Sequence, residues 1–237
     1  MEQFEIIIEK IRDNSIYELF CIDDRFCYRD IFNNIYKSPT FKFLLDDFLQ
    51  LLSEELKFNY SLTTLRFDFV NITNEGFNYL SDILKYNSSL SNLTISSYSF
   101  NGLDYISDAL KVNSYLTNLI INPYTNNVIE DKDLKNLSDA LKINSSLTNL
   151  WLAFEITDKG LEYISDALKI NSSLINLDFG IKKNVIDKDL KYLSDALKVN
   201  SSLINLSLYT KINKDTVYKY INEALENNIT LTKIRVT

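Results

Sequence analysis

Histidine is absent from this sequence of 237 residues, which also has only four glycines, two prolines, two cysteines and one tryptophan. Without histidine, the commonest general base, the usual partner of a nucleophilic serine or cysteine, and the commonest metal ligand are all missing. Cys21 and Cys27 alone are too few for a structural zinc site. No glycine-rich phosphate-binding loop occurs either. The sequence therefore predicts a protein that is not an enzyme and that binds no metal or cofactor.

Long apolar runs are also absent, since no stretch approaches the roughly 20 residues that span a membrane. The start, MEQFEIIIEK, places three isoleucines between glutamates, so we expect no secretory signal. The net charge of -7 argues against a nucleic-acid partner, because phosphate binding uses clustered lysine and arginine. We therefore expect a cytoplasmic protein with neither a nucleic-acid nor a membrane partner. The excess of Asn, Ile, Lys and Tyr suggests an AT-rich genome; for a virus or intracellular microbe, the predicted compartment would include the host-cell cytoplasm.

Repetition is what the sequence has in abundance. Seven copies of one phrase occur: a helix-like run, then Asn, two further residues that are mostly small and polar, and Leu-x-x-Leu-x-Leu. The clearest copies are LSDALKINSSLTNLWL (residues 137–152) and ISDALKINSSLINLDF (residues 164–179). The leucines that open the successive copies are Leu62, Leu90, Leu116, Leu147, Leu174, Leu203 and Leu231. Their spacing of 26 to 31 residues predicts a stacked repeat array.

One repeat shows what each residue type is expected to do. Thr157 or Asp158 is placed to cap a helix, and a stripe of Leu161, Ile164, Ala167 and Leu168 follows at helical spacing. Ser165 falls off this stripe, so we expect it to face water. Asn171 ends the helix, and we expect it to adopt the left-handed backbone conformation that such a cap favours. Equivalent caps are expected at Thr73, Ser99, Asp131, Asp187 and Asn213.

Each repeat thus reads as a strand followed by a helix, which predicts parallel strands with right-handed crossovers. Helices pack farther apart than strands do, so the array should bend with strands inside and helices outside. The fold class predicted is α/β: a curved solenoid of seven or eight repeats, with parallel strands on the concave side and helices on the convex side.

The pattern resembles the leucine-rich repeats of the ribonuclease-inhibitor type, and the wording ALKxNSSLTNLxL resembles the repeats of NLR-type intracellular sensors. This resemblance covers residues from about 40 to 237. It implies a horseshoe-like arc that recognises other proteins. The chain departs from the family where Asn or Cys usually follows each strand, since those positions hold Val70, Tyr98, Tyr124, Glu155, Lys182 and Lys211. Because the nucleotide-binding motif of NLR proteins is also missing, the resemblance is to their recognition part only.

The two ends of the chain differ from the middle. We expect residues 1–58 to be a degenerate first repeat and N-terminal cap, with Ile16 opening its strand, a helix inserted near residues 26–37 and a second helix over residues 41–58. Residues 59–237 form the repeats of one continuous domain. The alternative is that the first 58 residues form a small adaptor-binding helical module. At the other end, the strand at Leu231–Val236 leaves an open edge, which predicts a monomer or a weak homodimer through that edge, or further protein beyond it.

The frame also predicts which side chains leave the concave face of the sheet. Asn92, Asn118, Asn149, Asn176 and Asn205 should form a row that either bonds to itself or contacts a ligand. Trp151 should lie exposed in the middle of the array, as an anchor for a partner or as a cover for the sheet. The residues predicted to contact a partner are Arg66, Asp68, Ile120, Asn122, Trp151, Asp178 and Tyr209.

Together these patterns favour a scaffold without enzymatic activity that binds a protein or peptide partner through its concave face. The alternative is a structural or assembly subunit that associates through its C-terminal edge strand or its helical face. The sequence does not identify the partner.

Overall fold

The computed structural model describes residues 2–22, 25–30, 35–37, 45–124 and 129–237. The chain divides into two compact units, residues 1–127 (unit 1) and residues 128–237 (unit 2), and each is described by itself. In both units strand and helix alternate, the repeat strands are parallel, and the fold is the leucine-rich-repeat α/β fold that the sequence predicts. The expected extent of the N-terminal cap, residues 1–58, stays a prediction.

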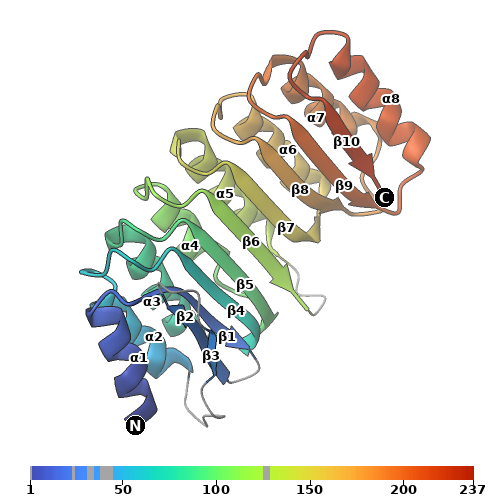
Figure 1. The fold of residues 1–237 in the computed structure, drawn as a ribbon. Coiled ribbons are helices and arrows are strands. Elements are labelled where there is room, and N and C mark those ends of the chain that lie inside the picture. Colours follow the sequence, from blue (N-terminus) through green and yellow to red (C-terminus); the bar gives the residue numbers. More distant parts are fainter. Residues whose placement is uncertain (1, 23–24, 31–34, 38–44, 125–128) are drawn as a thin grey trace. The chain divides into compact units, whose positions relative to one another are not determined.

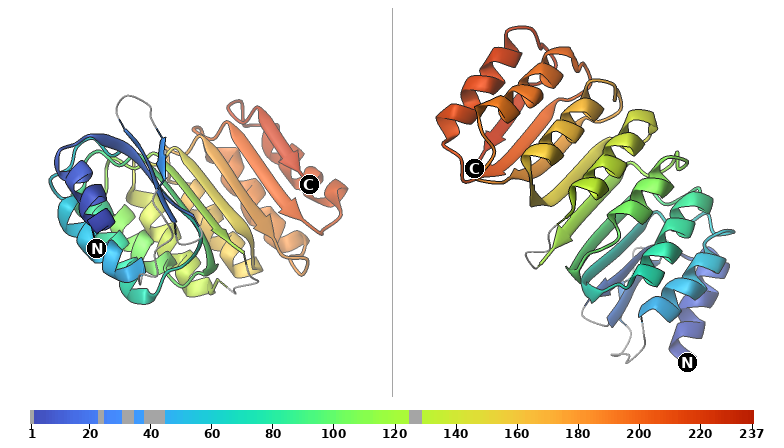
Figure 2. Two further views of the ribbon diagram at one scale, coloured as in Figure 1. Left: turned by 60° about the horizontal axis from the view of Figure 1, so that its bottom comes forward. Right: turned by 180° about the vertical axis from the view of Figure 1, so that it is seen from behind.

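Unit 1 is a mixed sheet with its helices on one face (Figures 1 and 2). Its elements are α1 (Glu2–Arg12), β1 (Ile16–Ile22), β2 (Arg25–Asp30), β3 (Ile35–Lys37), α2 (Leu45–Glu55), β4 (Thr64–Asn71), α3 (Asn74–Tyr86), β5 (Asn92–Ser99), α4 (Leu103–Leu110) and β6 (Asn118–Pro123). The strand order is β6-β5-β4-β1-β2-β3. Strand β1 pairs in parallel with β4, with Leu19 opposite Leu65, which is the register that the repeat frame predicts.

The helix predicted near residues 26–37 is wrong. Residues 25–30 and 35–37 form β2 and β3, which pair antiparallel to each other, and β2 pairs antiparallel to β1. The sequence of β2, Arg-Phe-Cys-Tyr-Arg-Asp, alternates aromatic and other side chains with the period of two that suits a strand. The second predicted helix is found as α2 over Leu45–Glu55, whereas residues 41–44 lie outside the described residues.

Unit 2 is a parallel sheet with the order β10-β9-β8-β7. Its elements are α5 (Asp131–Ile143), β7 (Asn149–Ile156), α6 (Asp158–Leu168), β8 (Asn176–Ile181), α7 (Asp187–Val199), β9 (Asn205–Thr210), α8 (Lys214–Leu225) and β10 (Lys233–Val236). The leucines of the frame are buried between the strands and the helices, as Leu174, Leu177 and Phe179 show at 0% exposure. This layer of apolar side chains holds each unit together through the hydrophobic effect.

The asparagine that ends each helix works through its side chain rather than through an unusual backbone. Asn87, Asn144 and Asn200 have φ between -81° and -69°, in the extended region, so the predicted left-handed conformation is wrong. Asn171 shows the alternative: its Oδ1 accepts hydrogen bonds from the backbone N–H groups of Ser173 at 3.1 Å and Leu174 at 2.8 Å. The asparagine therefore turns the chain from helix to strand through its own amide.

The same amide also connects neighbouring repeats. Nδ2 of Asn171 donates to the carbonyl oxygen of Leu141 at 2.7 Å, and Nδ2 of Asn200 donates to that of Leu168 at 2.8 Å. In unit 1, Nδ2 of Asn87 donates to Leu56 in the same way. These amides are at most 7% exposed, so each replaces water at backbone groups that would otherwise lack partners. The equivalent residues are Asn59, Asn87, Asn113, Asn144, Asn171, Asn200 and Asn228.

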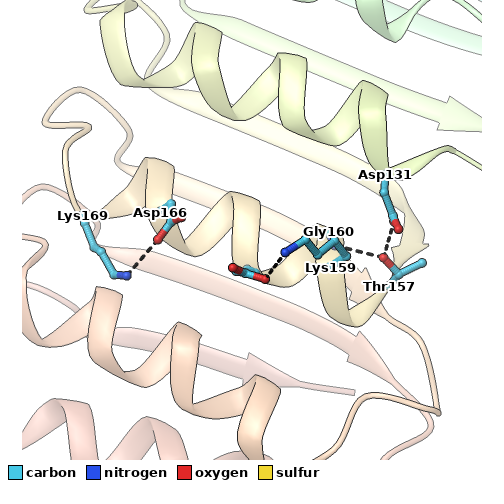
Figure 3. A network of polar contacts seen from close by, with 7 residues as sticks. Asp131, Thr157, Lys159, Gly160, Asp166 and Lys169 are labelled. Carbon is cyan, nitrogen blue, oxygen red and sulfur yellow. Dashed lines mark hydrogen bonds and ion pairs between the residues drawn. The ribbon is translucent and has the colours of Figure 1, made fainter.

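Some of the predicted helix caps are correct and others are not. Oγ1 of Thr157 accepts a hydrogen bond from the N–H of Gly160 at 2.9 Å and donates to the Asp131 carboxylate of the preceding helix (Figure 3). Thr73 and Asn213 also cap their helices as predicted. Ser99, Asp131 and Asp187 do not, because those helices begin after Gly102, Glu130 and Ile186. Asp131 instead binds the cap of the next helix.

Ser165 does not face water as the helical stripe predicts. It is 0% exposed, and Ser107, Ser138 and Ser194 are at most 1% exposed at the equivalent positions. Oγ of Ser138 donates to the carbonyl oxygen of Tyr163 on the next helix at 2.6 Å. A small side chain at this position lets neighbouring helices approach, so the position belongs to the helix–helix contact rather than to the surface.

Candidate functional site

The face of each sheet opposite its helices carries the residues predicted to contact a partner, and we call it the open face. In unit 1 these residues are Arg66, Asp68, Ile120 and Asn122; in unit 2 they are Trp151, Asp178 and Tyr209. In unit 2 they lie on the neighbouring strands β7, β8 and β9, whereas in unit 1 they lie on β4 and β6, with β5 between them. No group of His, Cys, Asp or Glu among the described residues is arranged to hold a metal ion. No described helix is long and apolar enough to cross a membrane.

On the open face of unit 1, two of the predicted residues bind each other. Nε of Arg66 donates to the carboxylate of Asp68, and Asp68 is only 3% exposed. Asp68 is therefore not the exposed contact residue that the frame predicts, because its carboxylate is buried against its own arginine. Ile120 and Asn122, on β6, are half-buried, and the rings of Tyr98 and Tyr124 pack 5.7 Å apart at the ends of β5 and β6.

The open face of unit 2 carries exposed aromatic side chains. Trp151 on β7 and Tyr209 on β9 are each 39% exposed. Trp151 lies opposite Asp178 on the intervening strand β8, and Tyr209 lies opposite Gly180 on that strand. Because Gly180 has no side chain, the space between the two aromatic residues is not filled from β8.

Strand β7 contains two residues more than β8 along the same length. Leu152 pairs with Phe179, but the next pair is Glu155 with Gly180, so Ala153 and Phe154 form a bulge. The sequence frame had placed Ala153 opposite Gly180, and the bulge replaces it with Glu155. A Cβ atom on Gly180 would lie 2.8 Å from the carbonyl oxygen of Phe154. Glycine is therefore needed at position 180 because the bulge backbone lies directly against it.

These features form a hollow of about 260 Å³ lined by Trp151, Ala153, Phe154, Glu155, Gly180 and Tyr209. Trp151, Phe154 and Tyr209 line it with aromatic rings, and Glu155 is its charged residue. Oε1 of Glu155 lies 3.7 Å from Nζ of Lys211, whose side chain is 74% exposed. This distance is longer than a hydrogen bond, so the lysine is loosely held and the carboxylate is available to a ligand.

The row of asparagines on the open face bonds to itself in unit 2. Nδ2 of Asn205 donates to Oδ1 of Asn176, and Nδ2 of Asn176 donates to Oδ1 of Asn149. In unit 1, Nδ2 of Asn92 donates to Oγ of Ser91 at 2.9 Å. Of the two alternatives, the self-bonded row is the one that these contacts support. These amides link the starts of β7, β8 and β9.

A second set of exposed apolar residues lies where the helices end, directly before each buried asparagine. It comprises Phe58, Tyr86 and Val112 in unit 1, and Ile143, Ile170 and Val199 in unit 2. The last three are each 62% exposed. The lysine before each of them pairs with an acidic residue three positions earlier, as Lys169 does with Asp166 at 2.8 Å. This helix-end row recurs before six of the seven buried asparagines; before Asn228 the residue is Asn227.

The descending side of each repeat, where the family usually has Asn or Cys, is satisfied by backbone bonds between repeats. The N–H of Lys182 donates to the carbonyl oxygen of Ile156 at 3.0 Å, and that of Tyr124 donates to Ser97 at 2.9 Å. The side chains there are consequently free to vary.

Sequence reasoning found Trp151 and Tyr209, but it missed Phe154 and assigned Glu155 only to a loop. The sequence gives no sign of the two-residue bulge, because the length of this repeat lies within the range of the others.

Comparison with known proteins supports the fold. No protein-family model matches the sequence, and no curated protein sequence matches it. A solved structure titled leiomodin-1 actin-binding site 2 is similar with a TM-score of 0.51 and 20% identity, over 65% of this chain and 90% of that chain. The tropomodulin C-terminal domain of Caenorhabditis elegans gives a TM-score of 0.49 at 13% identity, over 83% and 92%. A yeast complex of Rad7 and Elc1 gives 0.38 at 18% identity, over 81% and 61%. At these identities the likeness shows the fold alone.

Proposed function

We propose that the chain is a protein-recognition scaffold and that the open face of unit 2 binds a peptide segment of a partner protein. The observation that carries this proposal is the hollow between Trp151 and Tyr209. A concave, aromatic-lined surface with few polar groups is the usual form of a recognition pocket. Large aromatic side chains at such positions supply much of the binding energy at protein interfaces.

The aromatic side chains of this surface lie outside the buried layer between the sheet and the helices. Trp151 and Tyr209 leave more than a third of their surface in water, whereas the frame leucines beside them are buried completely or almost so. The leucines hold the sheet to the helices, so the aromatic residues add little to the core. Asp178, and on unit 1 Arg66, Ile120 and Asn122, are the further residues that we propose as contacts of a partner. Asp68 is left out because it is buried.

The finer resemblance gives the proposal its context. The repeat wording is similar to the ribonuclease-inhibitor type and to NLR-type sensors, whose repeats recognise proteins. The leiomodin-1 structure is titled as an actin-binding site, which makes a protein partner plausible for this fold. We propose a protein or peptide partner on these grounds, without assigning actin to this chain.

A library of displayed peptides tests the proposal. Peptides selected on the wild-type protein are expected to lose binding to the double variant Trp151→Ala/Tyr209→Ala by at least about ten-fold, since an aromatic hot spot contributes roughly 2 kcal/mol. The matched control is Ile170→Ala, which removes an exposed apolar side chain of the helix-end row on the same unit. Selected peptides that bind the double variant as tightly as the wild type would overturn the proposal, provided that its urea-unfolding midpoint is unchanged.

The alternative function, an assembly subunit, has its own supporting observation. Strand β10 pairs with β9, and no other described strand pairs with it. Lys233 and Arg235 on that strand are exposed and discourage strand addition. If the protein associates through this edge, Lys233→Thr/Arg235→Thr will raise its apparent mass in sedimentation at high concentration, whereas Trp151→Ala will not.

A further inference from the structure

The hollow has the chemistry of a site for a positively charged side chain. Three of its lining residues, Trp151, Phe154 and Tyr209, are aromatic, and its charged residue is Glu155. Aromatic faces attract cations through the negative charge of the ring, and the attraction is largest for tryptophan. We propose that the hollow binds one arginine side chain of the peptide partner, an inference that rests on the recognition function proposed above.

The charges around the hollow favour a cation over an apolar side chain. Asp178 lies directly across from Trp151 on β8, so a second carboxylate stands on the same face. The whole chain carries a net charge of -7, which attracts a basic segment over a longer range. A leucine or phenylalanine side chain would fill the hollow but would bring Glu155 out of water without a partner, which costs free energy.

The protein already keeps a cation of its own beside this carboxylate. Nζ of Lys211 lies 3.7 Å from Oε1 of Glu155, on the opposite side of β8 from the bulge. An exposed pair at this distance is weak. A guanidinium is flat, stacks on aromatic rings and donates two parallel hydrogen bonds to a carboxylate, which a lysine ammonium does not. An arginine ligand therefore displaces Lys211 and uses both the rings and the carboxylate.

The size of the hollow fits a single side chain. Its volume of about 260 Å³ is too small for a helix and matches one long side chain with part of its backbone. The amides of Asn149, Asn176 and Asn205 bond to one another. We therefore expect the ligand to bind at the hollow rather than along the whole sheet.

Fluorescence provides a direct test, because Trp151 is the only tryptophan of the chain. The probes are acetyl-Gly-Arg-Gly-amide and the same peptide with citrulline, which has the shape of arginine but no charge. The arginine peptide is expected to change the Trp151 emission at a concentration about five-fold lower than the citrulline peptide, from a cation–π and charge contribution of roughly 1 kcal/mol.

Two substitutions should act in opposite directions. Glu155→Gln removes the carboxylate and is expected to raise the dissociation constant of the arginine peptide about five-fold while leaving that of the citrulline peptide unchanged. Lys211→Gln removes the competing ammonium and is expected to tighten arginine binding about two-fold. Lys183→Gln, a substitution of an exposed lysine outside the hollow, serves as the matched control.

Several outcomes would overturn the inference: equal binding of the two peptides, no effect of Glu155→Gln, or no change of Trp151 emission with the arginine peptide. These outcomes are distinct from failure of the proposed function. If acetyl-Gly-Leu-Gly-amide binds at Trp151 as tightly as the arginine peptide, the hollow is still a recognition site. The proposed preference for a cation is then wrong. If library-selected peptides still bind the Trp151→Ala/Tyr209→Ala variant, the proposed recognition site itself is wrong.

Discussion

The start and the end of each strand obey different rules. At the start, the repeats use a buried asparagine whose amide turns the chain, and the amides of Asn87 and Asn171 also bond to the repeat before them. At the end, the side chains vary between repeats, from Val70 to Tyr98, Glu155 and Lys182, and β7 carries the bulge of Ala153 and Phe154.

This contrast separates the residues that build the fold from those that can recognise a partner. The strand starts satisfy buried backbone groups, so a change there leaves several of them without partners. At the strand ends, backbone bonds between repeats do this work, as at Lys182 and Tyr124, so the turn does not require one particular side chain. Variation there is tolerated, and the hollow of unit 2 lies in that variable region. Substitutions at the strand starts and at the strand ends should therefore have different effects.

The largest loss of stability is expected at a strand start. Asn171→Ala removes the acceptor for the N–H groups of Ser173 and Leu174 and the donor to the carbonyl oxygen of Leu141. Leaving such buried groups unpaired should lower the free energy of unfolding by about 3 kcal/mol. Urea unfolding followed by circular dichroism measures it. Ser172→Ala, which changes the exposed neighbour, should leave the midpoint in place. A loss below about 0.5 kcal/mol for Asn171→Ala would refute the role given to the asparagine.

A smaller loss is expected where the bulge presses on its neighbour. Gly180→Ala places a Cβ atom 2.8 Å from the carbonyl oxygen of Phe154, so the backbone must shift, at a cost of about 2 kcal/mol. The same substitution should shift the emission of Trp151, which lines the hollow. Ser207→Ala on the adjoining strand is the control. If the Gly180→Ala variant unfolds at the same urea concentration as the wild type, the bulge accommodates the methyl group without strain.

A helix cap should contribute less again. Thr157→Ala removes the acceptor for the N–H of Gly160 and the contact with Asp131, with an expected loss of about 1 kcal/mol in thermal or urea unfolding. Thr157→Ser keeps the hydroxyl and should retain most of the stability. Equal losses in the two variants would show that the methyl group, and not the cap, is what matters.

The smallest effect is expected at the buried helical serines, and its sign should depend on the partner. Oγ of Ser165 has no hydrogen-bond partner among the described residues, so Ser165→Ala should leave the free energy of unfolding unchanged or raise it slightly. Ser138→Ala, at the equivalent position, breaks the bond to the carbonyl oxygen of Tyr163 and should cost about 1 kcal/mol. The two variants should therefore differ in one urea series, and identical midpoints would contradict the assignment.

The sequence predicts the regular parts of this molecule well and the irregular parts poorly. The leucine frame locates β4 to β10 and their buried faces, and the helical periodicity locates α2 to α8, because both patterns repeat. The frame places Asn171 correctly at the end of the helix but not its conformation, since an amide side chain can serve the turn without a left-handed backbone. Thr157 and Thr73 are recognisable as caps, whereas Asp131 and Asp187 are one residue too late.

The candidate site shows the same limit. Trp151 and Tyr209 follow from alternation along their strands, and both are exposed as predicted. The bulge does not follow, because Leu-Trp-Leu-Ala-Phe-Glu-Ile reads equally well as an uninterrupted strand. The helix expected at residues 26–37 is wrong for a related reason: this segment lies outside the repeat, and no frame constrains it. Whether residues 1–58 serve as a cap stays a prediction.

One measurement tests the central claim that the strand ends carry recognition and the strand starts carry the fold. Deleting Ala153 and Phe154 together removes the bulge and restores the simple pairing of β7 with β8, keeping Leu152 and Ile156 on the buried side. The affinity of a library-selected peptide for this variant is compared with that for the wild type, with urea unfolding as the check on folding. We expect peptide binding to be lost and the unfolding midpoint to stay close to that of the wild type. Unchanged peptide affinity, or a protein that no longer folds, would contradict the account.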